Sequence, residues 1–269
     1  MTENSRIVLV TGAAGGIGAA ITKALIGAGH SVAAVDRDAE GLKRLAASER
    51  IHPITADLAG ETACREAVAS AVAHFGRLDA VINNAGVGVS SLRPDAEIDW
   101  PKIEELTCET WDNFFAINTR APWLITQAAL PHMRQGGFGR IVNVTTSFRT
   151  MLRILPYGAT KSALESMSSV WAQELERDRI TVNVLIPGGP TDTAIISDGA
   201  GWDRKKMLRP EIMGPPAAWL MSDKAADYTG QRIIAANWDG KLPGREAAAK
   251  AGRAIGWPEL GADAVWLKG

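Results

Sequence analysis

The chain has 269 residues, of which 46% are hydrophobic and 22% are charged. This composition is typical of a globular protein and excludes a disordered or fibrous chain. Lys and Arg number 29 against 30 Asp and Glu, so the net charge of -1 provides no basic surface for nucleic acid or an anionic membrane. We therefore expect small molecules and further copies of the chain as partners.

Cysteine, histidine and N-terminal patterns narrow the possibilities further. Cys64 and Cys108 have no CxxC spacing and the four histidines are scattered, so the sequence predicts neither a disulfide framework nor a metal site. The opening MTENSRIVLVTG lacks the pattern of a signal peptide, and no run of about 18 apolar residues follows it. These features predict a cytoplasmic protein that does not enter the membrane.

From residue 6 onward, short apolar segments alternate with segments of helical periodicity. Seven segments are predicted to be strands: 6–10, 31–35, 51–55, 79–83, 140–144, 181–186 and 232–236. Two intervening segments carry apolar side chains on one helical face, at Ile17, Ile21, Ala24, Leu25 and Ala28 and at Cys64, Val68, Val72 and Phe75. This alternation predicts a single α/β domain, a doubly wound parallel sheet with helices on both faces.

Three stretches depart from this alternation. Residues 87–107 and 190–214 form long irregular connections, and loops at the carboxyl ends of strands commonly build sites. Residues 241–269 lie beyond the last predicted strand and contain Trp257 and Trp266. Two tryptophans make this extension too apolar to be a free solvated end.

A glycine-rich sequence, TGAAGGIG, follows the first predicted strand and opens the first predicted helix. Gly12, Gly16 and Gly18 allow a sharp turn and a close approach of phosphate to the backbone N–H groups at the helix start. Asp36 ends the second strand, where a carboxylate can accept hydrogen bonds from an adenosine ribose and repels a 2′-phosphate. The pattern predicts NAD in preference to NADP. Two alternatives stay open: Arg37 could pair with the phosphate of NADP, and Asp36 could be an ordinary turn residue.

Tyr157 and Lys161 lie four residues apart at the start of a segment with the composition of a helix, which places both side chains on one face. A phenol with a pKa of about 10 is a poor base at neutral pH, but a nearby ammonium and a positively charged nicotinamide both favour the phenolate. Such a tyrosine can exchange a proton with an alcohol oxygen. By itself, the same spacing also occurs in surface pairs without function.

Together these motifs give the chain a family resemblance. They occur in the order TGAAGGIG, NNAG at 83–86, Asn118 in FAINT, RIVNVTTS, YGATK and PG at 187–188. Over about residues 5–240 the chain resembles the short-chain dehydrogenase/reductase family. The resemblance implies a Rossmann-type sheet of seven parallel strands and hydride transfer to or from a nicotinamide.

The resemblance also implies roles for individual residues. Tyr157 would be the general acid/base, Lys161 would hold the nicotinamide ribose and lower the pKa of the tyrosine, and Asn118 would support the active-site helix and a proton-relay water. The implied cofactor-binding residues are Gly12, Gly16, Ile17, Gly18, Asp36, Asp57, Leu58, Asn83, Tyr157, Lys161, Pro187, Gly188, Thr191 and Thr193. Among them, Asp57 would meet the adenine amino group and Asn83 would line the cofactor cleft.

Two positions depart from the family pattern. The family's catalytic serine ends the strand that precedes the tyrosine, and here VNVTTS offers Thr145, Thr146 and Ser147 at 12, 11 and 10 residues before it. Ser147 is the preferred catalytic residue because serine is less bulky, whereas alignment on the strand end selects Thr146. Pro190 stands where the family commonly uses a backbone N–H to hold the nicotinamide carboxamide, so Gly189 or Thr191 would have to replace it.

We therefore expect an NAD-dependent oxidoreductase that interconverts a secondary alcohol and a ketone. The alternatives are an NADP-preferring ketone reductase of the same family and a nucleotide-binding regulator without turnover. Apolar residues expected at the nicotinamide end indicate a hydrophobic cyclic or aromatic substrate rather than a sugar: Phe148, Met151, Leu152, Ile195, Ile196, Trp202, Met207 and Met213. Arg149 and Arg153 could instead clamp a carboxylate.

The helix predicted after Tyr157 indicates that the protein forms an oligomer. Its apolar residues cover more of the circumference than one sheet face needs: Leu164, Met167, Val170, Trp171 and Leu175. We expect a homotetramer, or a homodimer, and the resemblance implies that this helix pairs across a twofold axis together with the helix carrying Trp123. Residues 1–240 would form the dinucleotide-binding catalytic domain, and the extension 241–269 would pack on the domain or on a neighbouring subunit, with one of its tryptophans closing an active site.

Overall fold

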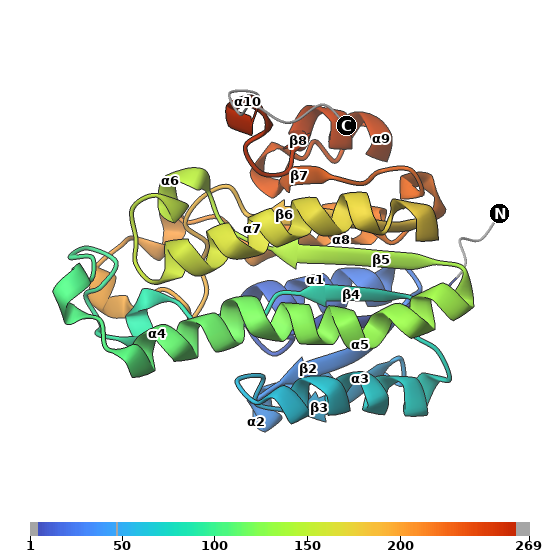
Figure 1. The fold of residues 1–269 in the computed structure, drawn as a ribbon, viewed down its shortest axis with the longest axis horizontal. Coiled ribbons are helices and arrows are strands. Elements are labelled where there is room, and N and C mark those ends of the chain that lie inside the picture. The colour runs from blue at the N-terminus through green and yellow to red at the C-terminus, as the bar shows by residue number, and fades with distance from the viewer. Residues whose placement is uncertain (1–4, 47, 262–269) are drawn as a thin grey trace, which may run out of the picture.

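The computed structural model describes residues 5–46 and 48–261, which form one sheet covered by helices on both faces (Figure 1). The strands are β1 (Ile7–Thr11), β2 (Ser31–Asp36), β3 (Ile51–Thr55), β4 (Ala80–Asn83), β5 (Gly139–Val144), β6 (Ile180–Ile186), β7 (Gln231–Ile234) and β8 (Gly252–Ala254). Their order across the sheet is β3-β2-β1-β4-β5-β6-β7-β8. The predicted α/β class and doubly wound arrangement are confirmed.

The sheet contains one strand more than predicted. The seven predicted strands are all present and pair in parallel. The eighth strand, β8, comes from the C-terminal extension and pairs antiparallel with β7, with Gly252 opposite Ile233. With only three residues, Gly-Arg-Ala, β8 is too short to show the apolar alternation by which strands are recognised. The prediction of seven strands is therefore wrong by this antiparallel edge strand.

Helices of very different length connect the strands. The α-helices are α1 (Gly16–Gly27), α2 (Ala39–Leu45), α3 (Glu61–Phe75), α4 (Cys108–Phe115), α5 (Ala121–Gly136), α6 (Phe148–Met151), α7 (Tyr157–Glu174), α8 (Gly214–Leu220), α9 (Gly244–Ala251) and α10 (Pro258–Gly261). Short 3₁₀ helices occupy Val89–Ser91, Ile103–Glu105, Glu176–Asp178, Asp198–Ala200, Arg204–Lys206, Pro210–Met213, Asp223–Ala225 and Ala235–Asn237. Among the described residues, no helix is both long and apolar enough to cross a lipid bilayer.

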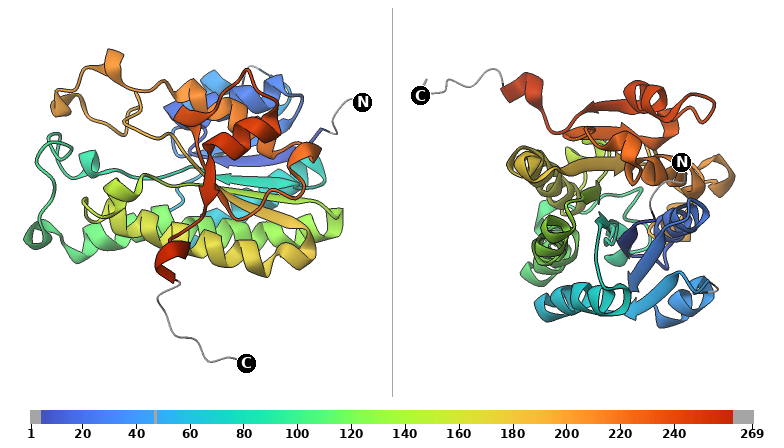
Figure 2. Two further views of the ribbon diagram at one scale, coloured as in Figure 1. Left: turned by 90° about the horizontal axis from the view of Figure 1, so that it is seen from above. Right: turned by 90° about the vertical axis from the view of Figure 1, so that its right-hand side faces the viewer.

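Two apolar layers, one on each face of the sheet, hold the helices in place. Val8 and Val10 of β1 pack with Ile21 of α1, in the layer that also covers α8 and α9. Leu9, between them in sequence, packs with Leu124 of α5 on the opposite face, which also carries α3 and α7 (Figure 2). Because parallel strands are buried on both faces, they appear in the sequence as continuous apolar runs.

A crevice is expected where the strand order reverses. The chain runs outward from β1 to β3, returns to pair β4 with β1, and then continues in the opposite direction. Ligands of doubly wound sheets bind at the carboxyl ends of the strands at such a reversal. The loops 87–107 and 190–214 meet beyond this end, where the Ser90 hydroxyl donates to the Ile195 carbonyl at 2.7 Å (Figure 2, left). The long loops therefore lie above the predicted site.

Candidate active site

The glycine loop between β1 and α1 is shaped for close approach of a ligand. Gly12 has a φ of +64°, in the left-handed region that favours glycine, and a Cβ at Gly18 would lie 2.0 Å from the Gly12 carbonyl oxygen. Ile17 is half-buried against the core beneath the loop. A side chain at Gly12 or Gly18 would thus close the turn at the α1 N-terminus. These residues fit the phosphates of a dinucleotide, which bind at helix N-termini.

Asp36, at the end of β2, is tied to the glycine loop. One carboxylate oxygen accepts from the Ala14 N–H and the other from the Asp38 N–H, each at 3.0 Å. The side chain is therefore fixed beside the loop, where an adenosine ribose would reach it. Arg37, the alternative determinant, is exposed.

The residues after β3 and in β4 separate into exposed and buried positions. Asp57 is exposed and its carboxylate accepts from the Ala59 N–H at 3.0 Å, whereas Leu58 is buried in the core. Asn83 is also buried, and its amide donates to Thr126 of α5 at 3.2 Å, so its side chain is directed into the helix layer. The resemblance implied that Asn83 lines the cofactor cleft, but its side chain points away from the cleft.

Asn84 is a site residue that the sequence reasoning missed. Its side-chain amide donates to the carbonyl oxygens of Thr11 and Gly12, at 2.9 and 3.1 Å, and so braces the glycine loop. The signal was present in the strand alternation. Val81 faces the α5 layer, so Asn83, two residues later, faces it too, and Asn84 is the first asparagine free to turn towards the loop.

Tyr157, Lys161 and Thr146 converge at the carboxyl end of β5. The Lys161 ammonium is buried, donates to the Val144 carbonyl at 2.9 Å and lies 5.9 Å from the centre of the Tyr157 ring. Burial lowers the pKa of Lys161 to about 8. Burial raises the pKa of Tyr157 to about 12, and a hydrogen bond from the Thr146 hydroxyl to the phenolate opposes that rise.

Ser147, the preferred catalytic hydroxyl in the sequence reasoning, is engaged elsewhere. It is the N-cap residue of α6, and its oxygen accepts from the Thr150 N–H at 3.1 Å. Its hydroxyl also hydrogen-bonds the Thr150 hydroxyl at 2.9 Å. Capping satisfies a helix N–H that otherwise has no partner, so this side chain has a structural task. Thr146, the alternative, carries the hydroxyl that lowers the pKa of Tyr157 against the effect of burial.

Asn118 lies in a π-helical turn, Ala116–Arg120, between α4 and α5. Its amide donates to the Val87 carbonyl and to the Thr160 hydroxyl, both at 3.0 Å, and its oxygen accepts from the Val87 N–H at 2.8 Å. The residue is fully buried. It therefore links the strand-end loop after β4 to the start of α7, the helix that carries Tyr157 and Lys161.

The loop after β6 closes over the glycine loop. Gly188 has a φ of +102°, and a Cβ at Gly16 would lie 2.8 Å from the Thr193 methyl group. The Thr191 hydroxyl donates to the Gly189 carbonyl at 3.1 Å, and the Thr193 hydroxyl donates to the Thr191 carbonyl at 3.3 Å. Both hydroxyls thus bond within their own loop. Pro187 and Pro190 bracket this turn in the sequence.

The expected apolar substrate wall divides into four groups. Leu152, Ile195 and Trp202 are exposed at the rim, with exposed fractions of 78%, 38% and 40%. Met213 is fully buried in the core with α1 residues and does not reach the substrate space. Phe148 packs on Trp257 of the extension, with ring centres 5.5 Å apart. The remaining residues are buried or half-buried: Met151, Ile196 and Met207. Trp266 lies outside the described residues.

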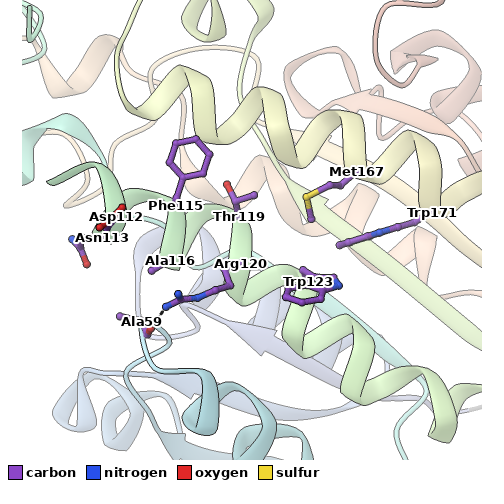
Figure 3. Close-up of a pocket in the computed structure, with 10 residues that line it drawn as sticks. All are labelled: Ala59, Asp112, Asn113, Phe115, Ala116, Thr119, Arg120, Trp123, Met167 and Trp171. Atoms are coloured by element: carbon purple, nitrogen blue, oxygen red, sulfur yellow. Dashed lines mark hydrogen bonds between the residues drawn. The ribbon is translucent and has the colours of Figure 1, made fainter. Parts of the chain in front are cut away.

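A separate groove of about 910 Å³ lies along α4, α5 and α7 (Figure 3), and Tyr157 is not among the residues that line it. Its walls are formed by Ala59, Asp112, Asn113, Phe115, Ala116, Thr119, Arg120, Trp123, Met167 and Trp171. Figure 3 shows Arg120 directed to the Ala59 carbonyl, to which it donates at 2.8 Å. We refer to this surface as the α5–α7 groove. It contains none of the residues that converge on Tyr157.

Comparisons with known proteins agree with this geometry. The family model described as short chain dehydrogenase matches residues 6–200. The chain is 32% identical to D-threitol dehydrogenase of Mycolicibacterium smegmatis over 252 residues, covering 86% of this chain and 91% of the relative. It is 30% identical to L-fucose dehydrogenase of Oryctolagus cuniculus over 246 residues, covering 85% and 83%. The solved structure of 3-ketoacyl-(acyl-carrier-protein) reductase from Brucella melitensis, complexed with NADH, superposes with a TM-score of 0.73 at 27% identity, covering 85% and 95%.

The fold and site define a Rossmann-type oxidoreductase, and the chain belongs to the short-chain dehydrogenase/reductase family. It is an NAD(P)-dependent dehydrogenase of this family. The alternative of a nucleotide-binding regulator without turnover is therefore set aside.

Proposed function

We propose that the protein is an NAD-dependent dehydrogenase that interconverts a secondary alcohol and a ketone. The observation that carries the proposal is the place of the Lys161 ammonium, which donates to the Val144 carbonyl at the end of β5 and lies 5.9 Å from the centre of the Tyr157 ring. Thr146 follows two residues after Val144. When bound, the nicotinamide supplies or accepts the hydride. The residues of the chain bind it, orient the substrate and move the proton.

Tyr157 is the proton donor in reduction and the acceptor in oxidation. Its pKa of about 12 keeps the phenol protonated at neutral pH, which suits donation to a carbonyl oxygen. Lys161 is placed to hold the nicotinamide ribose, and its charge favours the phenolate that oxidation requires. Asn118 positions the start of α7 through Thr160. We assign the orientation of the substrate oxygen to Thr146 rather than Ser147, because the Ser147 hydroxyl caps α6.

Asp36 supports NAD as the cofactor. Its carboxylate is held next to the glycine loop by two backbone N–H groups, so it cannot easily turn away from a 2′-phosphate. Gly12, Gly16 and Gly18 would receive the pyrophosphate, and Asp57 would meet the adenine. NADP with Arg37 as its determinant is the alternative, because Arg37 is the adjacent exposed cation.

For the substrate, the rim favours an alcohol with an apolar body. Leu152, Ile195 and Trp202 expose apolar surface on the two segments that border Tyr157, and such surface binds hydrophobic groups. A small polyol or sugar is the second candidate, because the relatives named above act on D-threitol and L-fucose. An alcohol with an apolar body would cover more of the exposed apolar side chains at this rim than a small polyol or sugar would.

We also propose that the enzyme is a homotetramer, or a homodimer, that assembles through the α5–α7 groove. Trp123, which lines the groove, is 44% exposed, and Val170, next to the wall residue Trp171 on α7, is 56% exposed. Large exposed apolar side chains beside a groove favour contact with another protein surface. A second copy would meet the same surface across a twofold axis.

The central experiment combines a substrate panel with one variant. NADH formation is measured with cyclic and aromatic secondary alcohols, D-threitol and L-fucose as substrates. Tyr157→Phe keeps the ring and removes the proton, so it should bind NADH, seen by fluorescence, and turn over none of these substrates. Undiminished turnover by Tyr157→Phe would refute the proposed chemistry. If the wild type has a higher kcat/KM with D-threitol or L-fucose than with the cyclic and aromatic alcohols, the substrate is a polyol or sugar.

A further inference from the structure

Glu165 of α7 and Arg232 of β7 form a buried ion pair behind the active site. Their side chains are 0% and 4% exposed, and Arg232 Nε donates to Glu165 Oε1 at 3.0 Å. Burying two charges is costly, and apolar residues of similar size often replace such pairs without loss of stability. Neither residue touches the proton path through Tyr157. The contacts that the pair makes therefore indicate what it does.

Glu165 joins three parts of the chain. Its Oε1 also accepts from the Gly256 N–H at 3.3 Å, and its Oε2 accepts from the Thr145 hydroxyl at 2.8 Å. Arg232 lies on β7 and Gly256 lies in the C-terminal extension, directly after β8. One carboxylate thus connects the end of β5, strand β7 and the extension.

Arg232 also contacts the end of β5, next to the Thr146 hydroxyl. Its Nη2 donates to the Thr146 carbonyl, and its guanidinium carbon lies 4.2 Å from the centre of the Phe148 ring. Trp257 packs on the same ring at 5.5 Å. The Thr146 peptide and the start of α6 are therefore held by Arg232 together with the extension.

The planar fork of arginine is what this arrangement requires. Nε and Nη2 bind two acceptors at once, Glu165 and Thr146, whereas a lysine ammonium at this depth would reach one of them. We propose that Arg232 is a positioning residue for the reaction: it fixes the Thr146 peptide, and thereby the hydroxyl that we assign to the substrate oxygen, with Glu165 as its counter-ion. This inference rests on the role of Thr146 proposed above.

Arg232→Lys tests the inference because it keeps the charge beside Glu165 and removes the fork. We expect kcat to fall at least tenfold, KM for NAD to stay within twofold and the melting temperature to change little. Arg245→Lys is the matched control, since Arg245 Nη2 donates to both carboxylate oxygens of the exposed Asp227 outside the site, and the variant should change neither kinetic parameter. Wild-type kcat in Arg232→Lys would overturn the proposal.

A second variant keeps the test decisive if Arg232→Lys does not fold. Glu165→Gln combined with Arg232→Met removes both charges. The glutamine carbonyl oxygen can still accept from the Gly256 N–H, and the glutamine amide can donate to the Thr145 hydroxyl. It should fold without a buried charge and still lose kcat at least tenfold, because the Thr146 carbonyl has lost its donor. Wild-type kcat in this double variant would also overturn the proposal.

The pH profile distinguishes positioning from simple stabilisation. The Thr146 hydrogen bond favours the phenolate of Tyr157, while Lys161 is the cation that faces the same ring. Misplacing Thr146 should therefore move the rise of alcohol-oxidation kcat/KM to higher pH in Arg232→Lys, and an unmoved profile counts against positioning. Thr146→Val is run in parallel. If it stays fully active, the role of Thr146 itself fails, and if it is inactive while Arg232→Lys is normal, only the positioning role fails.

Discussion

At the scale of single residues, the choice between two adjacent hydroxyls decides how the substrate oxygen is held. The Thr146 hydroxyl lowers the pKa of Tyr157, whereas Ser147 caps α6. Thr146→Ala should lower kcat by about two orders of magnitude, the usual effect of losing one donor to a developing oxyanion. Ser147→Ala should cost stability of about 1 kcal/mol through the lost cap and change kcat less. Steady-state kinetics and urea unfolding of both variants check this ranking, and the reverse order would return the catalytic role to Ser147.

Asp36 supports a prediction about the cofactor. The fixed carboxylate should repel a 2′-phosphate, so kcat/KM should favour NAD over NADP at least tenfold, about 1.4 kcal/mol. Asp36→Ala should narrow this ratio, and Arg37→Ala should leave it nearly unchanged. The measurement is kcat/KM with both cofactors for each variant. If the wild type prefers NADP, Arg37 and not Asp36 determines the cofactor specificity.

Lys161 gives the stability of the protein a pH dependence. Burial lowers its pKa to about 8 from 10.5, so in this range the unfolded chain binds more protons and folding becomes more favourable as pH rises. Relative to Lys161→Met, the wild type should gain about 2 kcal/mol between about pH 8 and pH 10. Tyr157, with its raised pKa of about 12, acts with the opposite sign only above this range.

Urea unfolding at both pH values measures the effect of Lys161. Lys250→Met serves as the control because Lys250, on α9, is exposed and forms a salt bridge with Asp239. Its stability difference from the wild type should be nearly the same at both pH values. A difference for Lys161→Met that does not change with pH would show that burial does not disfavour the ammonium.

At the scale of elements, the C-terminal extension acts on the site through β8 and the residues that follow it. Gly256 donates to Glu165, and Trp257 packs on Phe148 at the start of α6. Deleting residues 256–269 should raise KM for substrate several-fold and leave the affinity for NAD nearly unchanged, because the adenosine end of the cleft lies near β2 and β3. Trp257→Ala should reproduce part of the effect. Unchanged kinetics with a lowered melting temperature would give the extension a purely structural role.

At the scale of the whole molecule, the α5–α7 groove predicts assembly. The protein should sediment and scatter light as a tetramer or dimer at micromolar concentration. Trp123→Arg places a charge on this surface and should shift the protein towards monomers, because an unpaired charge at the centre of an interface is costly. Trp111→Arg is the control variant, because Trp111 is an exposed tryptophan on α4 that does not line the groove. A wild-type monomer would contradict the proposal.

The sequence by itself determined the features that depend on local spacing. The seven parallel strands follow from apolar runs, the turn at Gly12 follows from glycines between a strand and a helix, and Tyr157 and Lys161 share a face because four residues make about one helical turn. Strand alternation also contained the difference between Asn83 and Asn84, although the motif alone did not reveal it. In each case the interacting residues are close in sequence.

Only the tertiary structure decided what depends on distant contacts. Thr146 and Ser147 are equivalent by composition, and the backbone path at the end of β5 directs one to Tyr157 and the other to α6. The eighth strand exists because β7 offers an edge for pairing. The contact of Arg232 with Thr146 spans 86 residues. Short-range periodicity carries no information about such pairs, since their geometry is fixed by the packing of the sheet and its helices.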